Sequence, residues 1–199
     1  MATAPRDGVF LYHLTHINNM ESILRQGLIP RNQLMGNFVD TADPDIIAGR
    51  HEWDVDLSDF VPFHFFVKNP YDGAVCKKHG AENMVIIAIK RPTRDYDGFY
   101  IIPNHPLSGK PKFLPYSEGF QEVQWELMVN GPERCYSNPI IKHACMAECD
   151  VNRPVKVEEF VFVYVKTNAA EKRILEFPNS QKIAQKIRVN SYMFPYFNL

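Results

Sequence analysis

The chain has 199 residues, of which 45% are hydrophobic and 23% charged, a composition typical of globular proteins and unlike that of disordered ones. At ~150 residues per domain, this length favours one compact domain over residues 1–199. Lysine and arginine number 22 and aspartate and glutamate 23, for a net charge of −1. This balance excludes a strongly basic nucleic-acid coat protein, but it leaves room for a local basic groove.

No apolar run approaches the ~20 residues needed to cross a bilayer, and the N-terminal segment lacks the pattern of a secretory signal. The cysteines are Cys76, Cys135, Cys145 and Cys149, which lack the CxxC spacing of a zinc ribbon. We therefore expect a cytoplasmic protein that binds no metal. Two disulfide bonds among the four thiols remain the alternative.

The first part of the chain predicts a strand, a short helix and a long loop. Residues 9–14 form an apolar and aromatic stretch typical of a buried strand. Met20 and Ile23 follow at helical spacing, and Gly27 is typical of a helix C-cap. Segment 31–58 is polar, acidic and weakly periodic, and a loop of this length in a compact domain is usually a lid or a binding loop.

The rest of the chain adds mainly strands. Strands are expected at 60–67, 84–89 and 157–165, and a last one at 187–194. Helices are expected over 117–128 and 168–177, the second capped by Asn168. Because strands dominate and helices alternate with them only loosely, the predicted fold class is α+β without regular βαβ winding.

The common nucleotide, zinc-protease and hydrolase motifs are absent, so candidate chemistry depends on less specific groupings. His13 and Thr15 alternate onto one face of the first strand, where they could bind a polar ligand such as a ribose or a carboxamide. The alternative is structural: His13 satisfies a backbone carbonyl and Thr15 is a strand former.

Two charged residues are further candidates. Arg50 lies in the polar loop, where it is either a solvated charge or a cation that neutralises a pyrophosphate. Glu148 follows the small and apolar run 144–147, which indicates a half-buried carboxylate able to act as a base or to stabilise charge, unless it simply lies at the surface. Cys145 and Cys149, with His143 nearby, make a weaker nucleophile candidate, because nothing supplies oxyanion donors.

A family resemblance links these groupings. YHLTHINNMESILRQG, an arginine-bearing loop, DFVPFHFFVKNP and MAE before an apolar strand occur in this order between about Tyr12 and about Leu175. In these motifs the chain resembles the DarT family, NAD-dependent ADP-ribosyltransferase toxins that modify single-stranded DNA. The resemblance implies an ADP-ribosyltransferase-like split β-sheet core with NAD, the co-substrate, in the cleft between two sheets.

The resemblance also implies roles for particular residues. The contacts to the nicotinamide end of NAD would come from His13, Leu14 and Thr15, and Ser22 is a weaker candidate for the ADP-ribose. Arg50 would be the catalytic arginine on an NAD-binding lid at about 31–58, and Glu148 the catalytic glutamate. Phe63 and Phe65 would either wall the nicotinamide pocket or belong to the core. The stretch from about His105 to Ala147 would be the substrate loop.

The sequence leaves open which DNA base is modified. The chain reads VPFHFFVKNPYDG where thymine-modifying members carry VPFYF and a Pro-Arg-Ser-Pro run, and Cys149-Asp150 follows the glutamate where those members have apolar residues. This pattern looks more like the guanine-modifying branch. Guanine is therefore favoured and thymine is the alternative.

Single-stranded DNA requires cations and aromatic faces, and one stretch of the chain supplies both. The predicted DNA contacts are Arg91, Arg94, Lys110, Lys112 and Tyr116, with Lys90, Tyr96, Phe99, Tyr100 and Phe113 in the same stretch. The alternative is a solvated loop whose rings pack into the core. Competing functions are ADP-ribose transfer to RNA or protein, or a non-catalytic nucleic-acid-binding module. By resemblance, a toxin of this kind would have a macrodomain protein as its antitoxin.

Overall fold

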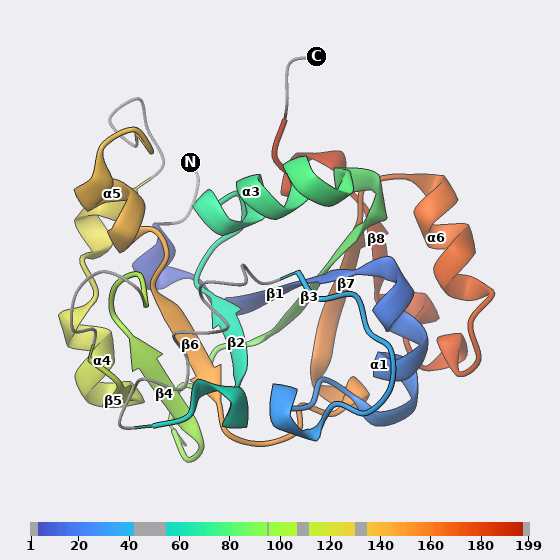
Figure 1. The fold of residues 1–199 in the computed structure, drawn as a ribbon, viewed down its shortest axis with the longest axis horizontal. Helices are drawn as coiled ribbons and strands as arrows, with labels where there is room; N and C mark the ends of the chain where they lie inside the picture. The colour runs from blue at the N-terminus through green and yellow to red at the C-terminus, as the bar shows by residue number, and fades with distance from the viewer. Residues whose placement is uncertain (1–3, 42–54, 95, 107–111, 130–134, 197–199) are drawn as a thin grey trace.

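The computed structural model describes residues 4–41, 55–94, 96–106, 112–129 and 135–196. They build one eight-stranded sheet in the order β5-β4-β6-β2-β1-β3-β7-β8, with helices on both faces (Figure 1). The strands are β1 (Phe10–His16), β2 (Val61–His64), β3 (Met84–Lys90), β4 (Phe99–Ile102), β5 (Leu114–Pro115), β6 (Glu148–Val151), β7 (Phe160–Val165) and β8 (Ile187–Val189). The α-helices are α1 (Met20–Gln26), α3 (Pro70–His79), α4 (Tyr116–Glu122), α5 (Pro139–Ala144) and α6 (Asn168–Leu175).

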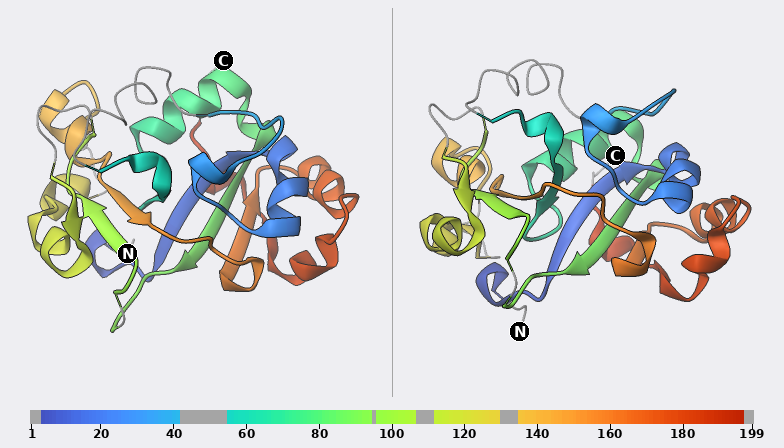
Figure 2. Two further views of the ribbon diagram at one scale, coloured as in Figure 1. Left: turned by 60° about the horizontal axis from the view of Figure 1, so that its bottom comes forward. Right: turned by 90° about the horizontal axis from the view of Figure 1, so that it is seen from below.

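Among the described strands, all neighbours pair antiparallel except β7 and β8, which are parallel. Helices α4 and α5 lie at one end of the sheet, and α6 with the C-terminal segment lies at the other (Figure 2). The predicted α+β class without regular βαβ winding is thus confirmed. Within the described ranges, none of the helices is long and apolar enough to cross a membrane.

The central strand β3 is buried on both faces, as its uninterrupted apolar sequence predicts. Val85, Ile87 and Ile89 belong to the larger core, which also contains the apolar residues of α1 and α6. Met84 and Ile86, which alternate with them, belong to a smaller core beneath α3. The two cores hold the sheet from both sides.

The end of α1 is fixed by Gly27, the predicted C-cap. Gly27 has φ +82°, and a Cβ atom there would lie 2.4 Å from the carbonyl oxygen of Val155. The next residue, Leu28, pairs with Val155 in an isolated β-bridge. Only glycine tolerates both the backbone conformation and this close approach.

The structure differs from the prediction at the end of one helix, the cap of another and the end of the last strand. The helix expected over 117–128 ends at Glu122, because Val123 is extended and the indole Nε1 of Trp125 donates to the carbonyl of Phe120, which a continuing helix would use. The side-chain cap of α6 comes from Thr167 and not from Asn168. The last strand stops at Val189, and a 3-10 helix (Ser191–Met193) replaces the predicted continuation.

Candidate active site

The site lies where the sheet opens between β1 and β2. On one edge, β1 pairs with β3 through seven residue pairs, from Phe10↔Lys90 to His16↔Met84. On the other edge, the single pair Tyr12↔His64 joins β1 to β2. Beyond this pair the two strands separate, and a hollow of about 1130 Å³, open to solvent, occupies the gap.

Five of the predicted site residues line this hollow together: His13, Leu14, Thr15, Ser22 and Glu148. His13 bridges the opening, since its ring Nδ1 lies 2.8 Å from the carbonyl oxygen of Pro62. A carbonyl oxygen only accepts hydrogen bonds, so Nδ1 carries the proton. The structural interpretation of His13 as a residue that satisfies a carbonyl is therefore correct, and the residue also lines the hollow.

Glu148 is the first residue of β6 and is only 7% exposed. It pairs with His64 of β2 on one side and with Ile102 of β4 on the other. No residue in the described part of the chain donates a hydrogen bond to its carboxylate. A buried acceptor at the wall of a hollow, without a donor among the described residues, is suited to bind a donor from a ligand.

His64 is a site residue that the sequence analysis did not single out. Its Nδ1 lies 3.3 Å from the carbonyl oxygen of Ala147, so this nitrogen also carries a proton, and Nε2 can accept a hydrogen bond only when the ring is neutral. The ring of Tyr71 packs against it at 5.3 Å between centroids, and both residues line the hollow. The signal in the sequence was strand alternation, which turns His64 away from Phe63 and Phe65.

The buried carboxyl group of Asp72 lies close enough to His64 to interact with it electrostatically. Asp72, in the first turn of α3, is 3% exposed, and its burial raises the pKa to about 6, although the nearby charge of His64 and hydrogen bonds from Lys68 and Asn69 act to lower it. The backbone N–H of Lys68 donates to Asp72 Oδ2 at 2.7 Å. Asp72 therefore changes charge close to neutral pH and places an electrostatic partner beside the imidazole.

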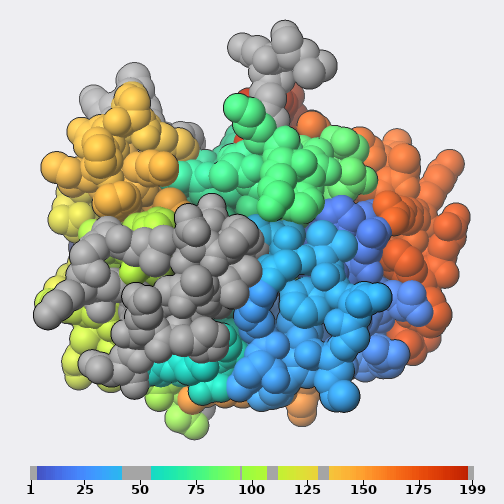
Figure 3. All heavy atoms as spheres, viewed as in Figure 1, coloured from blue at the N-terminus to red at the C-terminus, as the bar shows by residue number. Residues whose placement is uncertain are grey.

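Residues 31–41, the longer of the two described parts of the predicted lid, are anchored over the hollow. The side chain of Asn19 forms two hydrogen bonds with the backbone of Val39: its Nδ2 donates to the carbonyl oxygen at 2.9 Å, and its Oδ1 accepts from the N–H at 2.8 Å. Arg31 pairs with Asp40, and the hydroxyls of Thr41 and Tyr71 lie 2.9 Å apart. In the space-filling view this segment, in light blue, covers the front of the molecule beside α3 (Figure 3). Arg50 lies outside the described residues.

Comparison with known proteins identifies the family. The family model described as "ssDNA thymidine ADP-ribosyltransferase, DarT" matches residues 12–195. The chain belongs to the DarT family. A DNA ADP-ribosyl transferase of Thermus sp. (strain 2.9) is 28% identical over 130 residues, which is 58% of this chain and 62% of that relative. The match to this curated relative thus spans less than two thirds of its length.

The fold is that of solved DarT structures. Thermus sp. 2.9 DarT in complex with ADP-ribosylated ssDNA superposes with a TM-score of 0.79 at 19% identity, covering 98% of this chain and all of that one. The same enzyme in complex with NAD+ gives 0.75 at 18% identity, covering 95% and 98%. Thermosipho africanus DarTG in complex with ADP-ribose gives 0.71 at 19% identity, covering 94% of this chain and 51% of that one. The predicted ADP-ribosyltransferase-like split core is confirmed.

Two residues predicted to wall the pocket of this DarT-family chain belong to the core instead. Phe63 and Phe65 are 0% and 2% exposed and pack in the larger core, and neither lines the hollow. The reason is the pairing of Tyr12 with His64, which turns Pro62 and His64 toward the opening and the two phenylalanines to the other face.

The predicted DNA contacts fall into three groups. Arg94 is exposed, and Lys112 is exposed but paired with Glu122 at 2.9 Å. Arg91 and Tyr116 are 8% and 5% exposed and line a second hollow, separate from the candidate active site. Lys110 lies outside the described residues.

The predicted substrate loop at 105–147 is not a loop throughout. It contains α4, a 3-10 helix (Trp125–Met128) and α5, so much of it has regular structure. At its start, the ring of His105 stacks on that of His143 of α5 with 5.5 Å between centroids. Burial, with the nearby His143 and Lys142, lowers the pKa of His105 to about 4, so that it is neutral at pH 7.

The cysteines carry no sign of catalysis. All four are free, and three are buried. Cys145 donates to the carbonyl of Leu127 at 3.6 Å, and burial raises the pKa of Cys149 well above its usual value, so neither is poised as a thiolate. Among the side chains that the structure describes, no three His, Cys, Asp or Glu residues gather as a metal site would require.

Proposed function

We propose that this DarT-family chain transfers ADP-ribose from NAD to a nucleobase of single-stranded DNA, as the toxin of a toxin–antitoxin pair. The observation that carries the proposal is the buried Glu148 carboxylate, which faces the hollow together with His13 and Thr15 at the opening of the sheet. Support comes from the family match and from the solved relatives, whose ligands are NAD+ and ADP-ribosylated ssDNA.

The residues that line the hollow offer polar groups suited to NAD. His13, Leu14 and Thr15 lie at the mouth of the opening and would hold the nicotinamide end. Ser22 of α1 lines the same hollow and would contact the ADP-ribose; it also accepts from the side chain of Gln26 at 2.9 Å. The anchored segment 31–41 would cover the dinucleotide once it is bound.

The reaction requires a carboxylate beside the ribose. The bond between nicotinamide and C1′ breaks, nicotinamide leaves with the bonding electrons, and positive charge develops on the sugar. Glu148 would stabilise this charge through its carboxylate, whose effect is large because the group is buried and already oriented. A nitrogen of the target base then bonds to C1′ and gives up a proton, which Glu148 would accept.

Arg50 completes the proposal from the lid. We infer from its place in the family motif that its guanidinium neutralises the pyrophosphate or orients the target base. A cation is needed there because the pyrophosphate carries two negative charges into a partly closed site.

Three rings next to the hollow offer a path for the DNA. Phe60 lines the hollow and contacts Tyr100 at 5.6 Å and Phe113 at 4.9 Å between centroids. Tyr100 and Phe113 stack at 4.9 Å with 14° between their planes. Each base that stacks on such a ring gains roughly 1–3 kcal/mol, without regard to sequence.

Guanine is the base we propose, with thymine as the alternative that the family description names. The site presents two buried acceptors on neighbouring strands, the Glu148 carboxylate and Nε2 of His64. Guanine offers two adjacent donors, its ring N–H and its exocyclic amine, whereas thymine offers one N–H. Replacement His64→Phe removes one acceptor and should lower the preference for guanine over thymine.

The test is transfer of label from NAD carrying a radioactive adenylate to separate substrates. Single-stranded DNA with guanine as its target base, DNA with thymine in its place, RNA and bulk protein are each incubated with the enzyme, with Glu148→Gln as the blank. Label in the guanine-containing DNA alone supports the proposal in full, and label in the thymine DNA corrects the base. Label only in RNA or protein, or in none of the four, refutes it.

The proposal includes a neutralising partner, a macrodomain protein that removes ADP-ribose from DNA. Thermosipho africanus DarTG, of which this chain covers half, was solved with ADP-ribose. Co-expression with such a macrodomain should restore growth to cells that express this chain, and should do so only if the macrodomain keeps its hydrolase activity.

A further inference from the structure

A second hollow lies on the opposite face of β6 from the candidate active site. Glu148 faces the first hollow, and strand alternation turns the next residue, Cys149, to the other side. There the Cys149 thiol lies close enough to Arg91 and Tyr116 to affect both electrostatically. The second hollow has a volume of about 1070 Å³ and is open to solvent. It is lined by Arg91 and Tyr116 together with Arg6, Lys90, Tyr96 and Phe120.

Arg91 is a buried cation that forms no salt bridge with the carboxylates of the described residues, although Asp7 acts on it electrostatically. It is 8% exposed, and its two terminal nitrogens donate to the backbone carbonyls of Arg6 at 2.8 Å and Pro5 at 2.9 Å. Its Nε is buried and has no hydrogen-bond acceptor among the residues that the structure describes. Three rings, of Phe65, Phe120 and Trp125, surround the guanidinium at 5.1 to 5.9 Å.

A buried cation of this kind favours a negative ligand. Removing a charge from water is costly unless an opposite charge or a full set of hydrogen bonds compensates for it. Two carbonyls, three ring faces and the nearby charge of Asp7 compensate Arg91 only in part, and Gly8 leaves room beside the guanidinium, where a Cβ would lie 3.2 Å from Nη2. Arg6 and Lys90 add exposed positive charge at the rim, against the single acid Asp7.

The same hollow has an aromatic wall. The ring of Tyr96 stacks on that of Tyr116 at 4.8 Å with 15° between their planes, and Tyr116 stacks on Phe120 at 5.7 Å with 28°. Tyr96, the outermost of the three, is 38% exposed, and its hydroxyl donates to the carbonyl of Thr93 at 3.2 Å. One face of an oriented ring is thus free for a further flat group beside the cations.

Cations next to an open aromatic face match the two parts of a nucleotide. We propose that the second hollow binds one nucleotide of the DNA strand outside the reacting base, with its phosphate toward Arg91 and its base on Tyr96. This inference rests on the proposed function. The DNA strand would reach the second hollow by passing around the sheet edge formed by β4 and β5. On β4, Tyr100 contacts Phe60 at the first hollow, and the adjacent Phe99 contacts Tyr116 at the second, with 6.4 Å between centroids.

The test compares the binding of short and long DNA by fluorescence anisotropy, without NAD. Oligonucleotides of about 4 and about 16 nucleotides, the range of single-strand site sizes, are titrated against the wild-type chain and against Tyr96→Ala. The variant should bind the long strand roughly 5- to 100-fold more weakly, the equivalent of one lost base stack, and the short strand as the wild type does. Arg91 itself is left intact, because replacing a buried residue would mix binding with stability.

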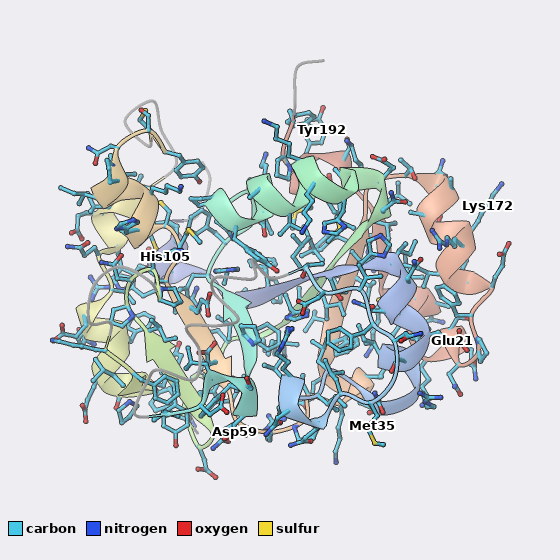
Figure 4. All side chains as sticks on the ribbon, viewed as in Figure 1. Glu21, Met35, Asp59, His105, Lys172 and Tyr192 are labelled. Atoms are coloured by element: carbon cyan, nitrogen blue, oxygen red, sulfur yellow. The ribbon has the colours of Figure 1, made fainter. Side chains whose placement is uncertain are left out.

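The cationic rim has a separate readout. Lys90→Ala should reduce the slope of log K against log salt for the long strand by about 0.7, the contribution of one phosphate contact on single-stranded nucleic acid. Matched controls lie at the other end of the sheet, where Tyr192 (73% exposed) and Lys172 are labelled in Figure 4. Tyr192→Ala and Lys172→Ala should leave both the affinity and the slope unchanged.

Three results would overturn the inference. The first is that Tyr96→Ala binds the long strand as tightly as the wild type does. The second is that the variant loses as much affinity for the short strand as for the long one. The third is that a free deoxynucleoside monophosphate displaces the long strand at the concentration at which the strand itself binds. The proposed function is judged separately, by transfer of label to the short strand. If that transfer occurs while Tyr96→Ala has no effect, only the second hollow is refuted.

Discussion

The two edges of β1 behave in opposite ways. Toward β3 every residue from Phe10 to His16 is paired, and all side chains of β3 except that of Lys90 are buried. Toward β2 a single pair, Tyr12↔His64, joins the strands before they separate. The paired edge provides the rigid support, and the unpaired edge provides the space in which a ligand can contact side chains from both halves of the sheet.

The difference shows how a buried carboxylate becomes available without being exposed. Glu148 is held on both sides by strand pairing, with His64 and Ile102, so its backbone is as constrained as that of the core. Its side chain nevertheless faces the opening. A group fixed by the sheet but facing the gap is oriented before a ligand arrives, which is what electrostatic stabilisation of a transition state requires.

The packed face should show the largest effect on stability. Replacement Phe63→Ala removes a ring that is 0% exposed and should lower the free energy of unfolding by about 3–5 kcal/mol. Urea denaturation followed by circular dichroism measures it. The matched variant Phe38→Ala, whose side chain is 38% exposed at the hollow, should cost less than 1 kcal/mol. Equal losses would mean that the two faces are not distinguished as described.

The open face should show the largest effect on activity. Glu148→Gln keeps the shape of the side chain and removes its charge, so transfer to DNA should fall roughly 100- to 1,000-fold while the unfolding midpoint stays close to that of the wild type. Single-turnover assays with labelled NAD measure the rate. Glu21→Gln, on the exposed side of α1, serves as the control and should retain full activity. A Glu148→Gln enzyme with wild-type turnover would contradict the assignment.

The pKa of Asp72 predicts a pH dependence of stability. Its folded value of about 6 lies above the ordinary value of 3.8, so between these pH values the native state binds more protons than the unfolded one. Its contribution to stability therefore falls as pH rises through this window. Asp72→Asn should equal the wild type near pH 3.5 and exceed it by roughly 2–3 kcal/mol at pH 7. Urea titrations at both pH values test this, and an advantage that does not grow with pH would refute it.

The smallest effect is expected at Asn19, which binds the lid segment 31–41 through the peptide of Val39. Asn19→Ala removes both hydrogen bonds to the peptide of Val39 and should raise KM for NAD by about 3- to 10-fold with little change in kcat. The neighbouring Asn18→Ala is the control, because Asn18 is exposed and bonds to Arg173, away from the lid. An unchanged KM in Asn19→Ala would show that segment 31–41 does not contribute to NAD binding.

The sequence predicted the candidate site better than the surfaces around it. His13, Thr15 and Glu148 were found from a short motif and from the apolar setting of the glutamate, both local signals, and the structure brings them to one hollow. His64 was missed, and Phe63 and Phe65 were chosen in its place, because alternation along β2 gives two possible faces. The choice between them depends on the register with β1, which is 52 positions earlier in the chain (64 − 12).

The sequence by itself determined the local elements. Apolar, β-branched runs specify β3 and β7, and Gly27 ends α1, because each depends on residues close together in the chain. Only the tertiary structure decided which edge of β1 opens, which face of β2 borders the gap, and that Arg91 is buried at the wall of a second hollow. These outcomes depend on contacts between distant segments, and composition and periodicity carry no information about which segments meet.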